Sequence, residues 1–176
     1  MSSPPSIQIH AFRGSRDSED EDPRLGRTGH VGISVDGGET IWGFNPVKPA
    51  GISRDELIIR LRAGESFPAW VREDTELFKR AEKSRPVLIE RRTSIDVSIC
   101  REVEKRLTSD IKNSTDSSLR GKRYSFPRKG SGGFEANCWN CCTYPSTLGM
   151  KTPFLSGQLG EYLEKDEYLL IRYSCR

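Results

Sequence analysis

Residues 29–46 read GHVGISVDGGETIWGFNP, and this stretch decides the fold. Residues 30–35 and residues 40–45 are both rich in β-branched and aromatic side chains, which favour strands. Between them, Asp36-Gly37-Gly38-Glu39 supplies two glycines that can adopt positive φ in a tight turn. We therefore predict an antiparallel hairpin, and with it an antiparallel sheet.

The register of this hairpin predicts which side chains share a face. Counting outward from Gly37 and Gly38 pairs Asp36 with Glu39 and His30 with Asn45. The apolar face then carries Val31, Ile33, Trp42 and Phe44, and the other face carries His30, Gly32, Gly43 and Asn45. Glycines let a helix approach closely, so we expect an element to pack beside His30. A turn at Asp36-Gly37 would pair His30 with Gly43 instead, and His30 and Asn45 would still share a face.

The remaining pattern predicts a single α+β domain over residues 1–176, in which helices pack on an antiparallel sheet. Strands are expected at residues 6–12, 87–95 and 167–173. Helices are expected from a capping box at residues 53–56 to Gly64, and at residues 74–83, 97–111 and 157–164. Residues 1–5 are expected to form a flexible tail, and residues 13–28 and 112–136 to form long loops.

Composition excludes several classes of function. The net charge is +3 and the 30% of charged residues are mixed in sign, so we expect no nucleic-acid partner. Mean hydropathy is −0.62 and no apolar run reaches membrane-spanning length, so we expect no transmembrane segment. The start of the chain lacks the order of a secretory signal, and we expect synthesis in the cytoplasm, with export by a route without a cleavable signal as the alternative.

The cysteine cluster at Cys138, Cys141 and Cys142 is the second chemical feature of the chain. Five cysteines are an odd number, which disfavours a disulfide framework. Asn137 can cap a helix that begins at the cluster, where the helix terminus favours a thiolate. Two alternatives remain: a zinc site without the second Cys pair that such sites need, and small buried hydrophobic residues. Cys100 is predicted to lie in the core, and we expect no metal and no cofactor.

A thiol nucleophile needs a base, and the chain contains only two histidines. His30 is the candidate base, because Asn45 beside it can hold the imidazole in the tautomer that presents its other nitrogen to a thiol. The alternative interpretation of His30 is a satisfied or exposed residue at the start of a strand.

These motifs resemble those of the permuted papain-like thiol hydrolases, which are related to NlpC-type peptidases and lecithin:retinol acyltransferase. The resemblance lies in the order G-H-x-x-I from Gly29, then G-F-x-P from Gly43, then N-C-x-T from Asn140. It implies a papain-like core in permuted order, in which the histidine strand precedes the cysteine helix. It also implies that Cys141 is the nucleophile, His30 the base and Asn45 the third polar residue.

Two further roles complete the predicted site. Cys138 is the alternative nucleophile if the helix starts earlier. The oxyanion candidates are the backbone N–H of Cys141, which a nucleophile at a helix terminus carries toward the reaction, and Tyr124, which resembles an aromatic residue that precedes the nucleophile in such enzymes.

Three hypotheses of function follow. The first is a cysteine hydrolase of amide bonds in peptides or peptidoglycan which, by analogy, resembles a secreted effector or toxin with an immunity or chaperone partner. The second is acyl transfer or protein deamidation at the same site; transfer to lipid would need an exposed apolar segment, for which residues 67–71 and 153–155 are short candidates. The third is a non-catalytic binding module whose cysteine cluster is structural or holds zinc.

Overall fold

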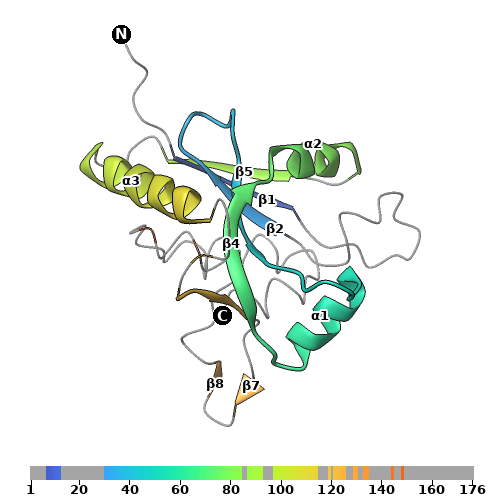
Figure 1. Cartoon of the computed structure of the whole chain (residues 1–176). Helices are drawn as coiled ribbons and strands as arrows, with labels where there is room; N and C mark the ends of the chain where they lie inside the picture. Colours follow the sequence, from blue (N-terminus) through green and yellow to red (C-terminus); the bar gives the residue numbers. More distant parts are fainter. Residues whose placement is uncertain are drawn as a thin grey trace.

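Six strands form one antiparallel sheet in the order β5-β1-β2-β3-β4-β6, and three helices accompany it among the residues that the structure describes (Figure 1). The computed structural model describes residues 7–12, 30–84, 87–92, 97–114, 119, 121–125, 129–130, 133–134, 144 and 148. The strands of the sheet are β1 (Ile7–Phe12), β2 (His30–Ser34), β3 (Trp42–Pro46), β4 (Phe67–Glu73), β5 (Val87–Arg92) and β6 (Arg123–Tyr124). The helices are α1 (Arg54–Arg62), α2 (Thr75–Ser84) and α3 (Val97–Asn113), and β7 (Lys129–Gly130) pairs with β8 (Gly133–Phe134). The predicted α+β class is confirmed.

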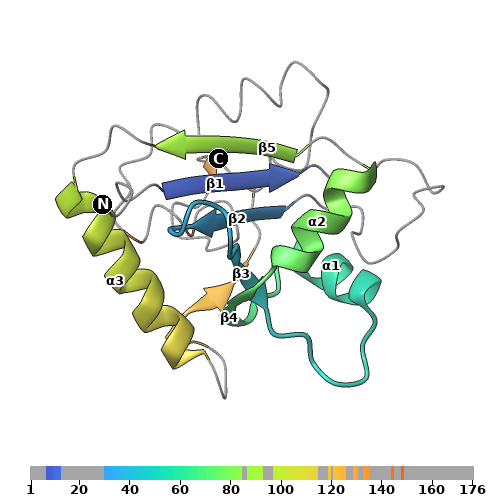
Figure 2. The same cartoon turned by 90° about the horizontal axis from the view of Figure 1, so that it is seen from above.

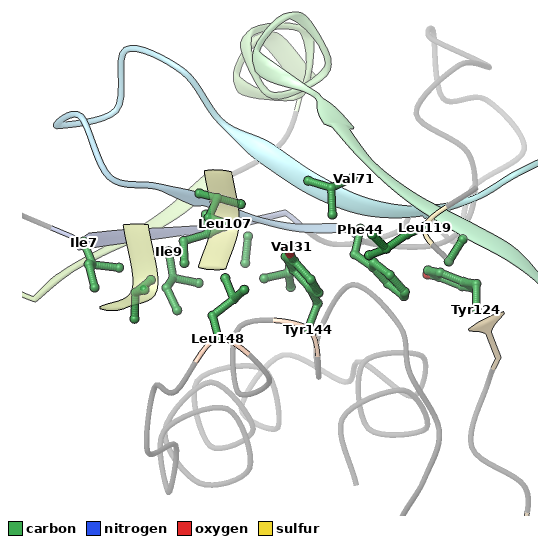
Figure 3. Packing of buried hydrophobic residues seen from close by; sticks show 14 of the residues in the cluster. Ile7, Ile9, Val31, Phe44, Val71, Leu107, Leu119, Tyr124, Tyr144 and Leu148 are labelled. Carbon is green, nitrogen blue, oxygen red and sulfur yellow. The ribbon is translucent and has the colours of Figure 1, made fainter. Parts of the chain in front are cut away.

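The two faces of the sheet bury different sets of side chains. One face forms the main core with α3, which contributes Cys100, Val103 and Leu107. Figure 3 shows Val31, Phe44 and Tyr144 within this core. The other face forms a smaller cluster with α2, in which Phe78 and Ala81 pack on Phe12 and Ile41. In Figure 1, α3 and α2 lie on opposite sides of the central strands.

Strand β1 lies where the sequence predicts, but both of its faces are buried. It runs between β2 and β5, as Figure 2 shows from above. Ile7, Ile9 and Ala11 belong to the main core. Of the intervening residues, His10 and Phe12 are covered by α2, since the rings of Phe12 and Phe78 lie 5.1 Å apart and those of His10 and Phe78 lie 5.9 Å apart. The alternation of apolar and polar residues therefore predicted the strand, but it did not predict that α2 packs on the second face.

The β2–β3 hairpin has the predicted register, because Gly32 pairs with Gly43 and Ile33 with Trp42. Its turn is wider than predicted. The ladder ends at Ile33 and Trp42, and Asp36 does not pair with Glu39. Instead the Asp36 carboxylate accepts bonds from Ser34 Oγ at 2.6 Å and from the Thr40 N–H at 3.0 Å, which organises a longer loop. Gly37 and Gly38 do adopt positive φ, of 81° and 97°.

Helix α1 begins and ends as the sequence predicts. Ser53 Oγ accepts a hydrogen bond from the Glu56 N–H at 3.1 Å, which satisfies one donor of the first turn. Gly64 follows the helix with a φ of 90°, and its N–H donates to the Leu61 carbonyl. The predicted α2, the predicted α3 and the burial of Cys100 are confirmed as well.

Strand β4 was not predicted, and it corrects one interpretation of the sequence. Residues 67–71 are not an exposed apolar segment, because Phe67, Ala69 and Val71 are buried in the main core. The expected loop at residues 112–136 is also wrong in part. Helix α3 continues to Asn113, and β6 pairs with the first residues of β4. A strand of two residues is too short to show periodicity in the sequence. Its position is determined instead by pairing with the edge of β4.

Several predicted elements lie outside the described residues. They are the tail at residues 1–5, the loop at residues 13–28, the helix at 157–164, the strand at 167–173 and the cysteines at positions 138, 141, 142 and 175. Within the described part of the chain, every helix is too short or too polar to cross a bilayer.

Candidate functional site

His30 begins β2 and turns its side chain toward α2, on the face predicted for it. Its side chain is 10% exposed, and Nε2 lies 2.7 Å from Oδ2 of Asp74. The rings of Phe78 and Phe12 lie 5.8 Å and 6.1 Å from the imidazole. This apolar surrounding lowers the local dielectric and strengthens the bond between His30 and Asp74.

Backbone hydrogen bonds also fix the position of Asp74. It lies between β4 and α2, where its N–H donates to the Ile41 carbonyl at 2.8 Å and its carbonyl accepts from the Phe78 N–H at 3.1 Å. The second bond closes the first turn of α2, so the carboxylate lies at the positive end of a helix. The side chain is only 1% exposed. Asp74 therefore presents a fixed negative charge to His30.

The two carboxylate oxygens of Asp74 accept hydrogen bonds from side chains on three strands. Oδ2 accepts from Asn45 Nδ2 at 2.8 Å as well as from His30, and Oδ1 accepts from Arg72 Nε at 3.3 Å. Burial opposes ionisation of this group most strongly. The bond from His30, the charge of His30, the bond from Asn45 and the charge of Arg72 together outweigh burial, and they lower the pKa of Asp74 below its ordinary value.

These bonds define the tautomer and the chemistry of the imidazole. An ionised carboxylate only accepts hydrogen bonds, so Nε2 of His30 carries a proton. When the ring is neutral, Nδ1 is then the basic nitrogen. Proton exchange between His30 and any group other than Asp74 therefore passes through Nδ1.

Gly43 and Gly32 make the space that this arrangement needs. A Cβ on Gly43 would lie 2.6 Å from His30 Nε2 and closer still to Asp74 Oδ2. A Cβ on Gly32 would lie 2.9 Å from Cε2 of Phe78, in α2. The predicted approach of a helix over these glycines is thus confirmed, and Gly43 lies directly under the bond between His30 and Asp74.

The structure brings His30 and Asn45 together, but around a residue that the sequence did not single out. Asn45 was expected to hold the imidazole itself, whereas its amide donates to the carboxylate that binds the imidazole. Asp74 appeared in the sequence only as the start of a predicted helix. An acidic residue at a helix start, three positions after the end of the apolar segment at residues 67–71, is the signal that could have identified it.

Tyr124 lies in the main core, on the face of the sheet opposite His30. Its ring stacks on Phe44 with centroids 5.7 Å apart and is almost completely buried. Figure 3 shows it beside Phe44, away from the α2 face. This packing gives Tyr124 a structural role in the core.

The cysteines proposed as nucleophiles, Cys141 and Cys138, lie outside the described residues. Tyr144, which follows Cys141 by three residues, is described, and it is buried against Phe44 in the main core. Within the described residues, no three His, Cys, Asp or Glu side chains come together as metal ligands. A search of protein-family models finds no match to the chain, and searches of curated proteins and of solved structures find none either.

Proposed function

We propose that the chain is a cysteine hydrolase that cleaves amide bonds through a thioester intermediate, with a papain-like core in permuted order. Cys141 is the nucleophile, His30 is the general base and acid, and Asp74 orients His30. The observation that carries this proposal is the buried bond between His30 Nε2 and Asp74 Oδ2, on a carboxylate that Asn45 and Arg72 also hold.

A catalytic role explains this pair better than stability does. Desolvation of a buried ion pair offsets much of the attraction between the charges, so apolar residues of similar volume stabilise a core as well or better. A carboxylate that fixes one tautomer of an imidazole, and stabilises the ring when it becomes protonated, does what proton transfer requires. Groups held in this way are typical of functional sites.

The proposed reaction proceeds in two stages. Nδ1 of His30 takes the proton of the Cys141 thiol, and the thiolate attacks the carbonyl carbon to form a C–S bond. The imidazolium then protonates the leaving nitrogen as the C–N bond breaks, which leaves a thioester. In the second stage His30 takes a proton from water, the hydroxide attacks the thioester, and the proton returns to the sulfur as the acid product departs.

Each neighbour of His30 has a distinct task in this mechanism. Asp74 keeps the proton on Nε2 and stabilises the imidazolium formed in each stage. Asn45 and Arg72 hold Asp74 ionised and fix its rotamer. The backbone N–H of Cys141 is the proposed donor to the developing oxyanion.

The substrate class rests on the resemblance to NlpC-type peptidases. It favours peptides or the peptide cross-bridges of peptidoglycan, and a role as a secreted effector or toxin. The apolar segment of β4 is buried, which removes one of the two segments considered for transfer of an acyl group to lipid.

The proposal is tested by alkylation of the thiols with iodoacetamide across a range of pH, with each modified cysteine located by mass spectrometry. Cys141 is expected to react well below the pH at which ordinary thiols react, because an imidazole partner stabilises the thiolate. His30→Ala is expected to remove this reactivity at low pH, and Asp74→Asn to reduce it. The control is Glu76→Gln, which makes the same acid-to-amide change at an exposed position in the first turn of α2.

Cys100 serves as an internal standard, because it is buried in the core and is therefore expected to react only when the protein unfolds. Equal reactivity of all exposed thiols, with no effect of His30→Ala, would reject the hydrolase. Fast reaction at Cys138 instead of Cys141 would reassign the nucleophile. Peptidoglycan peptides are the first substrates to test after a positive result.

A further inference from the structure

Trp70 and Arg72 of β4 lie on the face of the sheet that carries the His30 site. Trp70 pairs with Asn45 and Arg72 pairs with Gly43, and the side chains of paired residues share a face. The alternate residues of β4 are buried in the main core on the other face. Trp70 is partly buried, whereas the side chain of Arg72 is 54% exposed. Arg72 therefore presents its guanidinium group to solvent next to the His30 site.

This guanidinium group has donors to spare. Its Nε donates to Oδ1 of Asp74 at 3.3 Å, and its Cζ lies 5.8 Å from the centroid of the Trp70 ring. The four N–H groups on its two Nη atoms have no acceptor among the described residues. Two parallel N–H donors of this kind match the two oxygens of an oxyanion such as a carboxylate.

The indole of Trp70 carries another unused donor. Its Nε1 is buried and donates to no acceptor within the part of the chain that the structure describes. A buried donor without an acceptor costs free energy, and such a group in a native protein indicates a partner that is still to bind. Arg72 lies over this indole and is half-exposed, so rotation of the Arg72 side chain lets a ligand oxygen reach the N–H.

Arg54, the first residue of α1, adds a second positive charge near Arg72. Desolvation, followed by the charge of Arg72, lowers the pKa of Arg54. The opposing negative charges nearby, of which Asp55 is the largest, do not offset these two effects. Two guanidinium groups thus repel each other beside the His30 site, and an anion bound near both relieves that repulsion.

Asp55 and Asp74 decide which kind of anion fits. Both are carboxylates whose charge reaches Arg54, so they oppose a second negative charge more strongly as that charge increases. A ligand group with a single negative charge therefore meets less repulsion than a doubly charged phosphate. A carboxylate has this single charge, and its planar shape matches the guanidinium group.

We propose that Arg72, Arg54 and Trp70 form a binding site for the carboxylate group of an organic ligand. The two arginines supply the charge, and the indole N–H supplies a further hydrogen bond. The site consists of described residues alone and does not depend on the role of Cys141.

The test follows the indole N–H signals of the three tryptophans by NMR while N-acetylglycine is added at constant pH and ionic strength. The signal of Trp70 is identified by its absence in Trp70→Phe. It is expected to shift and to saturate at millimolar concentrations, as for a small ligand that makes few contacts. N-acetylglycinamide, a neutral molecule of the same size, should leave the signal unchanged, and inorganic phosphate should bind more weakly than N-acetylglycine.

Two variants test the arginines. Arg54→Gln removes one charge, and Arg72→Lys keeps a charge beside Asp74 but removes the two parallel donors. Each is expected to weaken the binding of N-acetylglycine about tenfold, as for the loss of one charge-assisted hydrogen bond. Arg60→Gln is the matched control and should bind as the parent does, because Arg60 lies on the same helix as Arg54 in a surface ion pair with Glu65.

Several outcomes would reject the carboxylate site. Equal shifts with the acid and the amide, or a shift that does not saturate, would show that the Trp70 signal responds to no specific anion. Parent affinity in either Arg54→Gln or Arg72→Lys would reject the site as proposed, and tighter binding of phosphate would reject the carboxylate class. If Arg72→Lys unfolds the protein, the comparison of Arg54→Gln with Arg60→Gln decides. No step requires turnover, so the result is independent of the proposed function.

Discussion

At Asp74, three side chains from three strands converge on one carboxylate: His30 of β2, Asn45 of β3 and Arg72 of β4. Because each of these strands is neighbour to the next in the sheet, the position of Asp74 depends on the correct pairing of all of them. A change at this residue therefore affects the site through both its charge and its geometry.

Gly43→Ala is the sharpest test of that geometry. The added methyl group would collide with Asp74 Oδ2 and His30 Nε2, and we expect a loss of about 3 kcal/mol of unfolding free energy, as for a broken buried pair. Urea denaturation measures this loss. Gly37→Ala is the control: it has open space around it and only a positive φ of 81°, so a loss of about 1 kcal/mol is expected. Equal losses in the two variants would contradict the close contact at Gly43.

Among the elements, the hairpin and the three helices could be predicted because their signals are local. The β2–β3 register follows from alternation around two glycines, and the start of α1 follows from the spacing of Ser53 and Glu56. The same alternation placed His30 and Asn45 on one face. Periodicity also placed Cys100 in the core.

The elements that were missed depend on contacts distant in sequence. Residues 67–71 are apolar at almost every position and contain Pro68, so they show no contrast between inward and outward side chains. Their burial is decided by pairing with β3 and by the cover from α3. Asp74 was missed as a site residue for a related reason, since it lies 44 positions from His30.

Ser53→Ala tests the local signal at the start of α1. Loss of the bond to the Glu56 N–H is expected to destabilise the protein by about 1 kcal/mol in urea or thermal denaturation. Ser53→Thr retains an acceptor and should recover most of that loss. If Thr is no better than Ala, the side-chain oxygen at position 53 does not stabilise the helix.

On the scale of the whole molecule, helices pack on both faces of the sheet and bury the His30–Asp74 pair, so the ionisation of this pair is linked to unfolding. The pKa of Asp74 is lowered from 3.8 in the folded state, and a lowered carboxyl pKa stabilises the fold above the unfolded value. This contribution is fully present well above pH 3.8 and disappears as the pH falls through the lower folded pKa.

We therefore expect the thermal midpoint to fall more steeply with acid in the parent than in Asp74→Asn, measured by circular dichroism from about pH 6 to about pH 2. The difference between the two curves isolates Asp74 from Asp36, whose pKa is also lowered. Parallel curves would show that the Asp74 carboxylate has the same affinity for protons in the folded and unfolded states.

The glycine beneath the His30–Asp74 bond also limits how the protein can evolve. Every other amino acid carries a β-carbon, so no inherited substitution at position 43 leaves that contact as it is. A lineage that gave up this glycine would have to rebuild the carboxylate, the imidazole or the approach of α2 at the same time. Substitutions are therefore expected to accumulate at positions around the site, while position 43 stays glycine for as long as the site is under selection.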